Sequence, residues 1–307
     1  MACEENNGAG IFLNLERGFF PGAALLRSLP RIRRARAFRL YAEDGRRFID
    51  LWQYGGRAVL GHTPSGVLLE LKNAAARGLF APFPGCYEGR LVKALSRIFP
   101  GKAVRLYPDE AALRRALALA GYDAGSPFPD PAFAAASRPA RPEVCRASEK
   151  PAPILWRPFL ENEAEAEPAS PPASPLVPVM PLALAGAPQV LILDNAMETA
   201  FPVSGQDCIS PAVLAAAARS VWDLIAAAPE RGALKFPRIR KALGKSEWRR
   251  RGVYLTRDTE DEESWAGLFR RFLEKGFLLP PSSRSPLILP GELSPGEEAA
   301  LAGCLAF

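Results

Sequence analysis

The two side chains with the clearest chemical potential in this sequence are His62 and Asp194. His62 is the single histidine, and the pKa range of a histidine suits a general base. No serine or cysteine is placed to act with it, so the sequence favours a structural hydrogen-bonding role. Asp194 ends the apolar run 190–193, and an acid at the end of a buried strand caps a loop in many folds. No catalytic residue is therefore predicted from spacing alone.

Composition limits the kinds of site and compartment. The sequence has five scattered cysteines and a single histidine. This composition predicts neither a zinc site nor a disulfide framework. No apolar run reaches the roughly 18 residues of a membrane span, and the first residues lack the layout of a signal peptide. With 307 residues, 48% of them hydrophobic, we expect a soluble cytoplasmic protein with one large and one smaller domain.

The formal charge of +6 is concentrated in two basic stretches, 31–36 and 235–251. Such stretches can contact the phosphates of a nucleic acid. They can also be a solvated helix face, and we favour this interpretation because neither stretch has the aromatic or metal-ligand pattern of a nucleic-acid module. Nucleic acid is therefore an unlikely partner and the third of three hypotheses.

Hydrophobic spacing and turn residues indicate which elements position these side chains. Residues 38–52 alternate as a strand pair that turns at Glu43-Asp44-Gly45. The run 190–194 is typical of a strand buried on both faces of a parallel sheet, and Ser294 with Glu297 forms a capping-box pattern. Pro229 is expected to stop the helix before it. Further patterns predict helices near 64–78, 87–98, 110–120, 210–228 and 262–275, and strands near 104–107, 154–159, 253–255, 277–279 and 287–289.

Residues 121–188 differ from the rest in being rich in proline, alanine and glutamate. Only 154–159 has the pattern of a strand there. The stretch 161–175 offers little apolar surface to offset the entropy of ordering it. We therefore expect a linker over about 121–188, exposed and weakly ordered at 161–175.

Residues 39–64 resemble the class III aminotransferases, which belong to fold type I of the pyridoxal phosphate (PLP) enzymes. The resemblance rests on Asp44-Gly45, Phe48-Ile49-Asp50-Leu51 and Leu60-Gly61-His62-Thr63-Pro64. The C-terminal Gly276-Phe277-Leu278-Leu279-Pro280-Pro281-Ser282 is similar to the glutamate-1-semialdehyde aminomutase branch. The resemblance implies an α/β fold: a reduced large domain with a parallel-rich sheet, and a small α+β domain. It implies an N-terminal segment at 1–60 packing with the small domain, a large domain at 61–208 and a small domain at 209–307.

The family's cofactor chemistry needs a Schiff-base lysine, a carboxylate for the pyridine nitrogen, a phosphate cup and a stacking aromatic ring. By resemblance Asp194 matches the carboxylate, as a relic. No lysine lies between Asp194 and position 210. At the cup, Tyr107-Pro108-Asp109-Glu110 stands in place of serine, glycine and threonine, so a proline without an N–H and two acids would meet the phosphate. The family's downstream aromatic-His-Gly motif, which would supply the stacking ring, is also missing, and the linker stands in its place. Three of the four requirements are therefore unmet.

The sequence therefore predicts a degenerate class III aminotransferase-like protein, a pseudoenzyme without cofactor or metal, acting as a binding or structural protein. The alternative is an active PLP-dependent aminotransferase or aminomutase with unusual cofactor binding. The segment 54–83, which resembles the family's dimer interface, is still apolar and glycine-rich. We therefore expect a homodimer that buries the region around His62.

Overall fold

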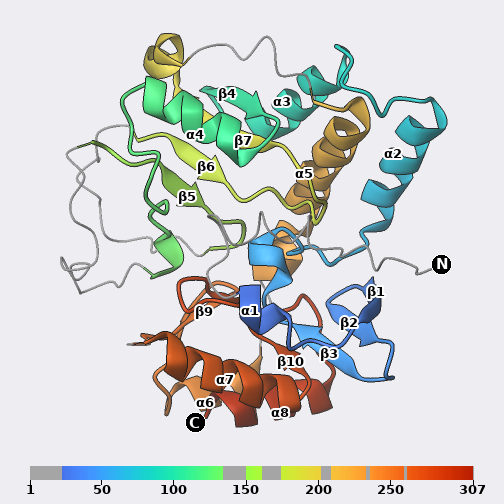
Figure 1. Ribbon diagram of the computed structural model, residues 1–307, viewed down its shortest axis with the longest axis vertical. Helices are drawn as coiled ribbons and strands as arrows, with labels where there is room; N and C mark the ends of the chain where they lie inside the picture. Colours follow the sequence, from blue (N-terminus) through green and yellow to red (C-terminus); the bar gives the residue numbers. More distant parts are fainter. Residues whose placement is uncertain are drawn as a thin grey trace, which may run out of the picture.

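The computed structural model describes residues 23–133, 150–160, 174–201, 209–232, 236–258 and 261–306. Figure 1 shows two packing units, one above the other. We call the upper one the large unit, which contains the described residues of 65–201 and 211–232. We call the lower one the small unit, which contains the described residues of 32–50 and 237–305. The short helix α1 (Ala23–Leu26) precedes the first strand. The short helix η1 (Gln53–Gly56) lies where the chain passes from the small unit to the large unit.

A four-stranded sheet joins the two ends of the chain in the small unit. β2 and β3 form an antiparallel hairpin whose turn contains Gly45 with φ 86°, a conformation that glycine adopts without steric cost. β3 then pairs in parallel with β10 through Ile49 and Phe277. The N-terminal and C-terminal segments thus share one sheet, in the order β1 (Ile32–Arg36), β2 (Arg39–Ala42), β3 (Arg47–Asp50) and β10 (Phe277–Leu278).

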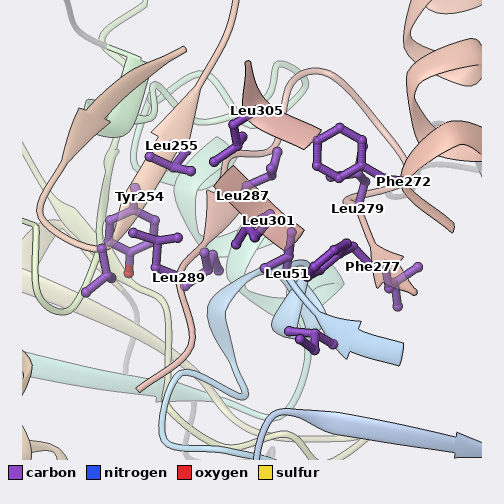
Figure 2. Close-up of a cluster of buried hydrophobic side chains, with 14 of the residues drawn as sticks. Leu51, Tyr254, Leu255, Phe272, Phe277, Leu279, Leu287, Leu289, Leu301 and Leu305 are labelled. Carbon is purple, nitrogen blue, oxygen red and sulfur yellow. The ribbon is translucent and has the colours of Figure 1, made fainter. Parts of the chain in front are cut away.

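A three-stranded antiparallel sheet and three helices complete the small unit. The sheet has the order β11 (Leu287–Ile288), β9 (Tyr254–Thr256) and β8 (Arg249–Arg251). The helices are α6 (Pro237–Leu243), α7 (Glu262–Glu274) and α8 (Pro295–Leu305), and α8 begins at the predicted capping box. Figure 2 shows the buried core between them, where side chains from β3, β9, α7 and α8 meet. Its labelled members include Leu51, Leu255, Phe272, Phe277 and Leu301.

The large unit is built on the strand β7 (Gln189–Asp194), which is buried on both faces. Val190 and Ile192 pack with the α3 and α5 side chains, whereas Leu191 and Leu193 pack with the α4 side chains. The alternation follows from the two-residue period of a strand. The sheet order is β4 (Lys102–Tyr107), β7, β6 (Leu176–Pro178) and β5 (Ile154–Trp156). The helices are α2 (Ser65–Ala76), α3 (Tyr87–Ile98), α4 (Glu110–Leu119) and α5 (Pro211–Gly232).

The α/β class is confirmed, but the sheet of the large unit is not parallel-rich in the described residues. β7 pairs antiparallel with both β4 and β6, and only β5 with β6 is parallel. The continuous apolar run of β7 reflects helices on both faces and says nothing about strand direction. Residues 179–188 connect β6 directly to β7 without a helix, and a parallel crossover needs a dozen or more residues.

The long helix α5 differs from the sequence predictions in three ways. It continues past Pro229 to Gly232, because a proline in the last turn removes only one helical hydrogen bond. It packs on α2 and α3, so it belongs to the large unit although the boundary was placed at 209. Its stretch Pro211–Arg231 is also long and apolar enough to span a membrane, which the sequence reading missed. Within it, 56% of an 18-residue window is buried in the fold.

The basic stretches and the proposed linker also differ from expectation. Residues 32–36 of the first basic stretch form the strand β1 rather than a helix face, and the second basic stretch is divided between α6 and β8. The region 121–188 contributes β5, β6 and the helix η2 (Pro131–Phe133) to the fold, because its apolar residues, such as Val177, fill the core. Residues 161–173, where weak order was predicted, lie outside the described part.

Candidate functional site

Asp194 lies where the sequence places it, at the C-terminal end of β7, but its partner was not predicted. In the β4–β7 pairing, Asp194 is opposite Lys102, and Lys102 Nζ forms an ion pair with Asp194 Oδ1. The two side chains are 32% and 42% exposed. The carboxylate is therefore neutralised at the surface by a lysine from the neighbouring strand. The helix η3 (Asn195–Ala200) follows directly.

The residues at the predicted cup lie at the other end of the same strand pair. Tyr107 ends β4 and pairs with Gln189, the first residue of β7. Asp194 lies five positions after Gln189 in β7, which is roughly 17 Å at about 3.4 Å per residue. The antiparallel pairing thus keeps the two candidate subsites apart.

The N-terminus of α4 uses its own acids as partners. Asp109 Oδ1 accepts a hydrogen bond from Ala112 N at 2.7 Å, as an N-cap. Glu110 Oε1 accepts from Arg114 Nε at 2.6 Å. Burial raises the pKa of Glu110, although the hydrogen bond from Arg114 opposes this. The Asp109 carboxylate therefore takes up one of the helix N–H groups that an anion would need.

His62 joins the end of β3 to the segment before α2. Its Nε2 lies 2.7 Å from Asp50 Oδ2, and its backbone N donates to Ala37 O at 2.8 Å. Asp50 is 1% exposed, and its Oδ1 also accepts from the N–H groups of Trp52 and Gln53. The buried carboxylate is thus fully engaged, and this geometry suits the predicted structural role of His62.

A tight turn after Asp50 is held in an unusual backbone conformation. Gln53 and Tyr54 have φ values of 48° and 51°, which are rare for residues other than glycine. Gln53 Nε2 donates to Ile288 O at 2.9 Å, so the turn is tied to β11. Residues in such conformations are kept there by their surroundings.

Two buried arginines at this turn were missed by the sequence analysis. Arg157 donates to Asp130 from Nε at 2.7 Å and to Gly55 O from Nη1 at 3.1 Å. Its guanidinium also lies over the ring of Tyr254 at 5.3 Å. Burial alone would lower the pKa of Arg157, but the charge of Asp130 outweighs it and holds that pKa above its ordinary value. The signal was available, since Arg157 interrupts the apolar run 154–159.

The second buried arginine, Arg231, has no carboxylate partner among the described residues. Its Nη2 donates to Val59 O at 2.9 Å, and its guanidinium lies 5.3 Å from the centroid of the Phe38 ring and 5.4 Å from that of the Phe159 ring. Nε and Nη1 have no hydrogen-bond partner in the described part of the chain. Burial lowers the pKa of Arg231 to about 10. Together, Arg157 and Arg231 bind the segment 55–59 to its surroundings.

Comparison with solved structures decides the fold. Acetylornithine aminotransferase from Elizabethkingia anophelis superposes with a TM-score of 0.63 at 13% identity, over 96% of this chain and 97% of that one. Ornithine δ-aminotransferase from Plasmodium falciparum gives 0.60 at 13% identity, over 90% and 91%. An omega-transaminase from Sphaerobacter thermophilus gives 0.60 at 12%, over 97% and 98%.

The chain has the class III aminotransferase fold. At such low identities, the likeness establishes the fold alone. No protein-family profile matches the sequence. An uncharacterized protein of Treponema pallidum (strain Nichols) is 29% identical over 306 residues, covering 87% of this chain and 91% of that protein. An uncharacterized protein of Borreliella burgdorferi is 36% identical over 75 residues, covering 24% of this chain and 28% of that protein.

The side chains of this aminotransferase-like fold do not fit PLP. A carboxylate that binds the pyridine nitrogen and a lysine that forms the Schiff base must stand at opposite ends of the pyridine ring, yet Lys102 directly contacts Asp194. Asp109 accepts a hydrogen bond from a helix N–H group, that of Ala112, where a phosphate would bind. Within the described residues, no group of three or more histidine, cysteine, aspartate or glutamate side chains could hold a metal ion.

Proposed function

We propose that this protein is a degenerate aminotransferase-like pseudoenzyme that forms no internal Schiff base with PLP and acts as a binding or structural protein. The observation that carries the proposal is the antiparallel β4–β7 pair. It sets Asp194 against Lys102 at one end and leaves Tyr107 and the acids after it at the other. A cofactor must bind a carboxylate and a phosphate site at once, but here the two lie at opposite ends of the strand pair.

The loss of phosphate binding alone is large enough to matter. Each charge-assisted hydrogen bond to an anion contributes about 1.5–3 kcal/mol. Losing several of them therefore raises a dissociation constant by several powers of ten. Asp109 adds repulsion, because its carboxylate occupies the N-cap of α4.

Visible absorption spectra of the purified protein test the proposal. We expect a colourless protein, and added PLP should give only slow, unselective adducts with surface lysines. The alternative of an active aminotransferase or aminomutase has one observation in its favour, which is a lysine beside Asp194. Lys102→Ala is therefore the informative variant, with Lys93→Ala as a control on α3. A stoichiometric visible band that Lys102→Ala alone abolishes, with amino-group transfer to a keto acid, would establish the alternative.

We also propose that the protein is a homodimer. Its support is a set of exposed apolar side chains on α2 and the segment after it, with Leu69 58%, Phe80 65% and Phe83 58% exposed. Such a patch on a soluble protein marks an interaction site. Light scattering at micromolar concentration should give twice the chain mass, and Phe80→Ser with Phe83→Ser should give a monomer. A monomeric wild-type protein would contradict the proposal.

A cytoplasmic location accompanies this proposal. Its support is that Cys86 and Cys304, the two described cysteines, are both free thiols, as expected in a reducing compartment. Fractionation of cells that produce the protein, with an antibody against it, tests the location. Recovery in the membrane or secreted fraction would contradict it.

A further inference from the structure

The strand β1 is the outer strand of the four-stranded sheet in the small unit. In the order β1-β2-β3-β10 its one neighbour is β2, and Figure 1 shows β1 at the margin of the small unit. An outer strand presents N–H and C=O groups with which another extended segment can pair. The direction in which the backbone groups of β1 point therefore decides what this edge can bind.

The backbone groups of Ala35 point away from β2. In an antiparallel pair, only every second residue of a strand exchanges N–H···O bonds with a given neighbour. Ala42 N donates to Arg46 O at 2.9 Å across β2 and β3, so Leu40, two positions earlier, also directs its N–H and C=O at β3. Ala35 lies opposite Leu40, and no described segment elsewhere bonds to the backbone of Ala35. Its N–H and C=O therefore face the outer edge of the sheet.

The side chains of β1 make this edge strongly basic. Arg34 and Arg36 are two positions apart in the strand, so their side chains lie on the same face. The register against β2 shifts between Ile32 and Arg34, which makes Arg33 the extra residue of a bulge. These three arginines and Arg31 are exposed, and we call the four of them the edge arginines.

The edge arginines have no acid partner in the described parts of the chain, although an arginine on the next strand does. Arg39 on β2 pairs with Glu292 and Glu297, both at 2.8 Å. The guanidinium of Arg34 lies 4.2 Å from the centroid of the Tyr41 ring, a contact that leaves its charge without a counterion. Four adjacent cations thus stand along an edge that has backbone groups to offer.

These charges determine which strand can pair at the edge. A second copy of β1 would bring like charges opposite one another, which destabilises paired strands. A charged, bulged edge is a common protection against such pairing. A strand with acids at alternate positions would instead place all of them on one face, opposite Arg34 and Arg36, and opposite charges stabilise the pairing. The edge therefore disfavours a second copy of itself and favours an acidic partner.

We propose that the β1 edge binds an acidic peptide as an added strand, with acids at alternate positions opposite Arg34 and Arg36. The backbone of Ala35 supplies hydrogen bonds, and the arginines supply specificity. The residues between the acids lie on the face of Ala35 and of Ile32, which is 38% exposed, so short apolar side chains suit them. This inference is independent of the cofactor proposal, because it involves neither Asp194 nor the N-terminus of α4.

Titration of a labelled, blocked peptide of alternating glutamate and valine with the full chain tests the role of the arginines. Fluorescence anisotropy compares the wild type with Arg34→Gln/Arg36→Gln. The control Arg240→Gln/Lys241→Gln removes the same charge from exposed positions of α6. The dissociation constant should rise at least about threefold in the β1 variant and less than about 1.5-fold in the control. Equal constants in all three proteins, or a wild type that does not bind the peptide, would overturn the proposal.

Two N-methylated peptides test whether the backbones pair. One carries methyl groups on its glutamate amides and the other on its valine amides, so the two have the same charge. Alternate residues of a strand direct their N–H groups at opposite edges. One peptide should therefore lose at least about tenfold in affinity, because several hydrogen bonds are removed, while the other should bind nearly as well as the parent. Equal affinities of the two methylated peptides would contradict an added strand.

A single-stranded oligothymidylate and light scattering test the other possible occupants of the edge. An oligothymidylate with the charge of the peptide should bind at least about tenfold more weakly, because it cannot form the strand hydrogen bonds. Light scattering should give the same mass for the wild type and Arg34→Gln/Arg36→Gln. An oligothymidylate that competes on equal terms would show that the edge binds any polyanion, and a change in mass would place a second copy there. Either result would overturn the proposal.

Discussion

Lys102 and Asp194 face one another across the antiparallel β4–β7 pair and form an ion pair at the surface of the large unit. Both side chains are about one-third exposed or more, and solvent screens such a pair. The pair therefore holds Asp194 in place without adding much stability.

The first prediction is that Asp194→Asn changes the free energy of unfolding by less than about 1 kcal/mol. Urea unfolding of Asp194→Asn, Lys102→Met and the double variant gives the coupling between the two side chains, which should also stay below about 1 kcal/mol. A loss above about 2 kcal/mol in Asp194→Asn alone would mean that Asp194 has a further partner.

The second prediction concerns the buried pair of Arg157 and Asp130. Arg157→Met leaves the Asp130 carboxylate without its main partner and removes the bond to Gly55 O. Breaking a buried ion pair costs about 3–5 kcal/mol, so urea unfolding should show a loss of that size. Arg115→Met, on the exposed face of α4, is the control and should change stability by less than about 0.5 kcal/mol. If Arg157→Met and Arg115→Met lower stability by similar amounts, Arg157 and Asp130 do not form a stabilising buried ion pair.

The third prediction is that Arg231→Met destabilises the protein much less than Arg157→Met does. Its free energy of unfolding should stay within about 1.5 kcal/mol of the wild-type value. The change loses the hydrogen bond to Val59 O, but it also removes a desolvated cation with two unpaired nitrogens. A loss as large as that of Arg157→Met would reveal an anionic partner outside the described residues.

The lowered pKa of Arg231 gives this third prediction a pH dependence. The ordinary arginine value is 12.5 and the folded value is about 10. Between these values the unfolded chain binds more protons, so the wild type gains stability relative to Arg231→Met as the pH rises above about 10. If the stability difference between the wild type and Arg231→Met does not change as the pH rises above about 10, burial does not lower the pKa of Arg231.

The fourth prediction concerns Glu297, which caps α8 and binds Arg39. The hydrogen bond from Arg39 is the main reason why the pKa of Glu297 falls to about 2 from 4.5. Its stabilising effect is fully present above about pH 4.5 and is lost as the pH falls toward 2. Glu297→Gln should therefore be less stable than the wild type by about 1–2 kcal/mol at pH 6, after allowance for solvent screening. Unfolding curves at pH 6 and pH 2.5 should show the difference shrinking, and a constant difference would contradict the prediction.

Most elements could be predicted from local patterns in the sequence. The helix α3, the β2–β3 hairpin and the capping box of α8 all follow from side-chain spacing and turn residues. Each of these signals lies within a few residues, so no knowledge of distant contacts is needed. The motif at 39–64 also led to the correct fold.

Features that depend on long-range contacts could not be predicted. The direction of β7 relative to β4 depends on how chain segments far apart meet, and a continuous apolar run fits either direction. For the same reason the ion pair of Lys102 with Asp194, 92 residues apart, has no local signal. Arg231 near the end of α5 resembles an ordinary helix-terminal cation in sequence, yet it is 7% exposed.

We propose that this protein forms no internal Schiff base with PLP. The most direct measurement is borohydride reduction of the protein after incubation with stoichiometric PLP, followed by peptide mass spectrometry of the modified lysines. We expect sparse labelling spread over several exposed lysines, unchanged in Asp194→Asn. Near-complete labelling of a single lysine, lost in Asp194→Asn, would contradict it and make the protein an active PLP enzyme.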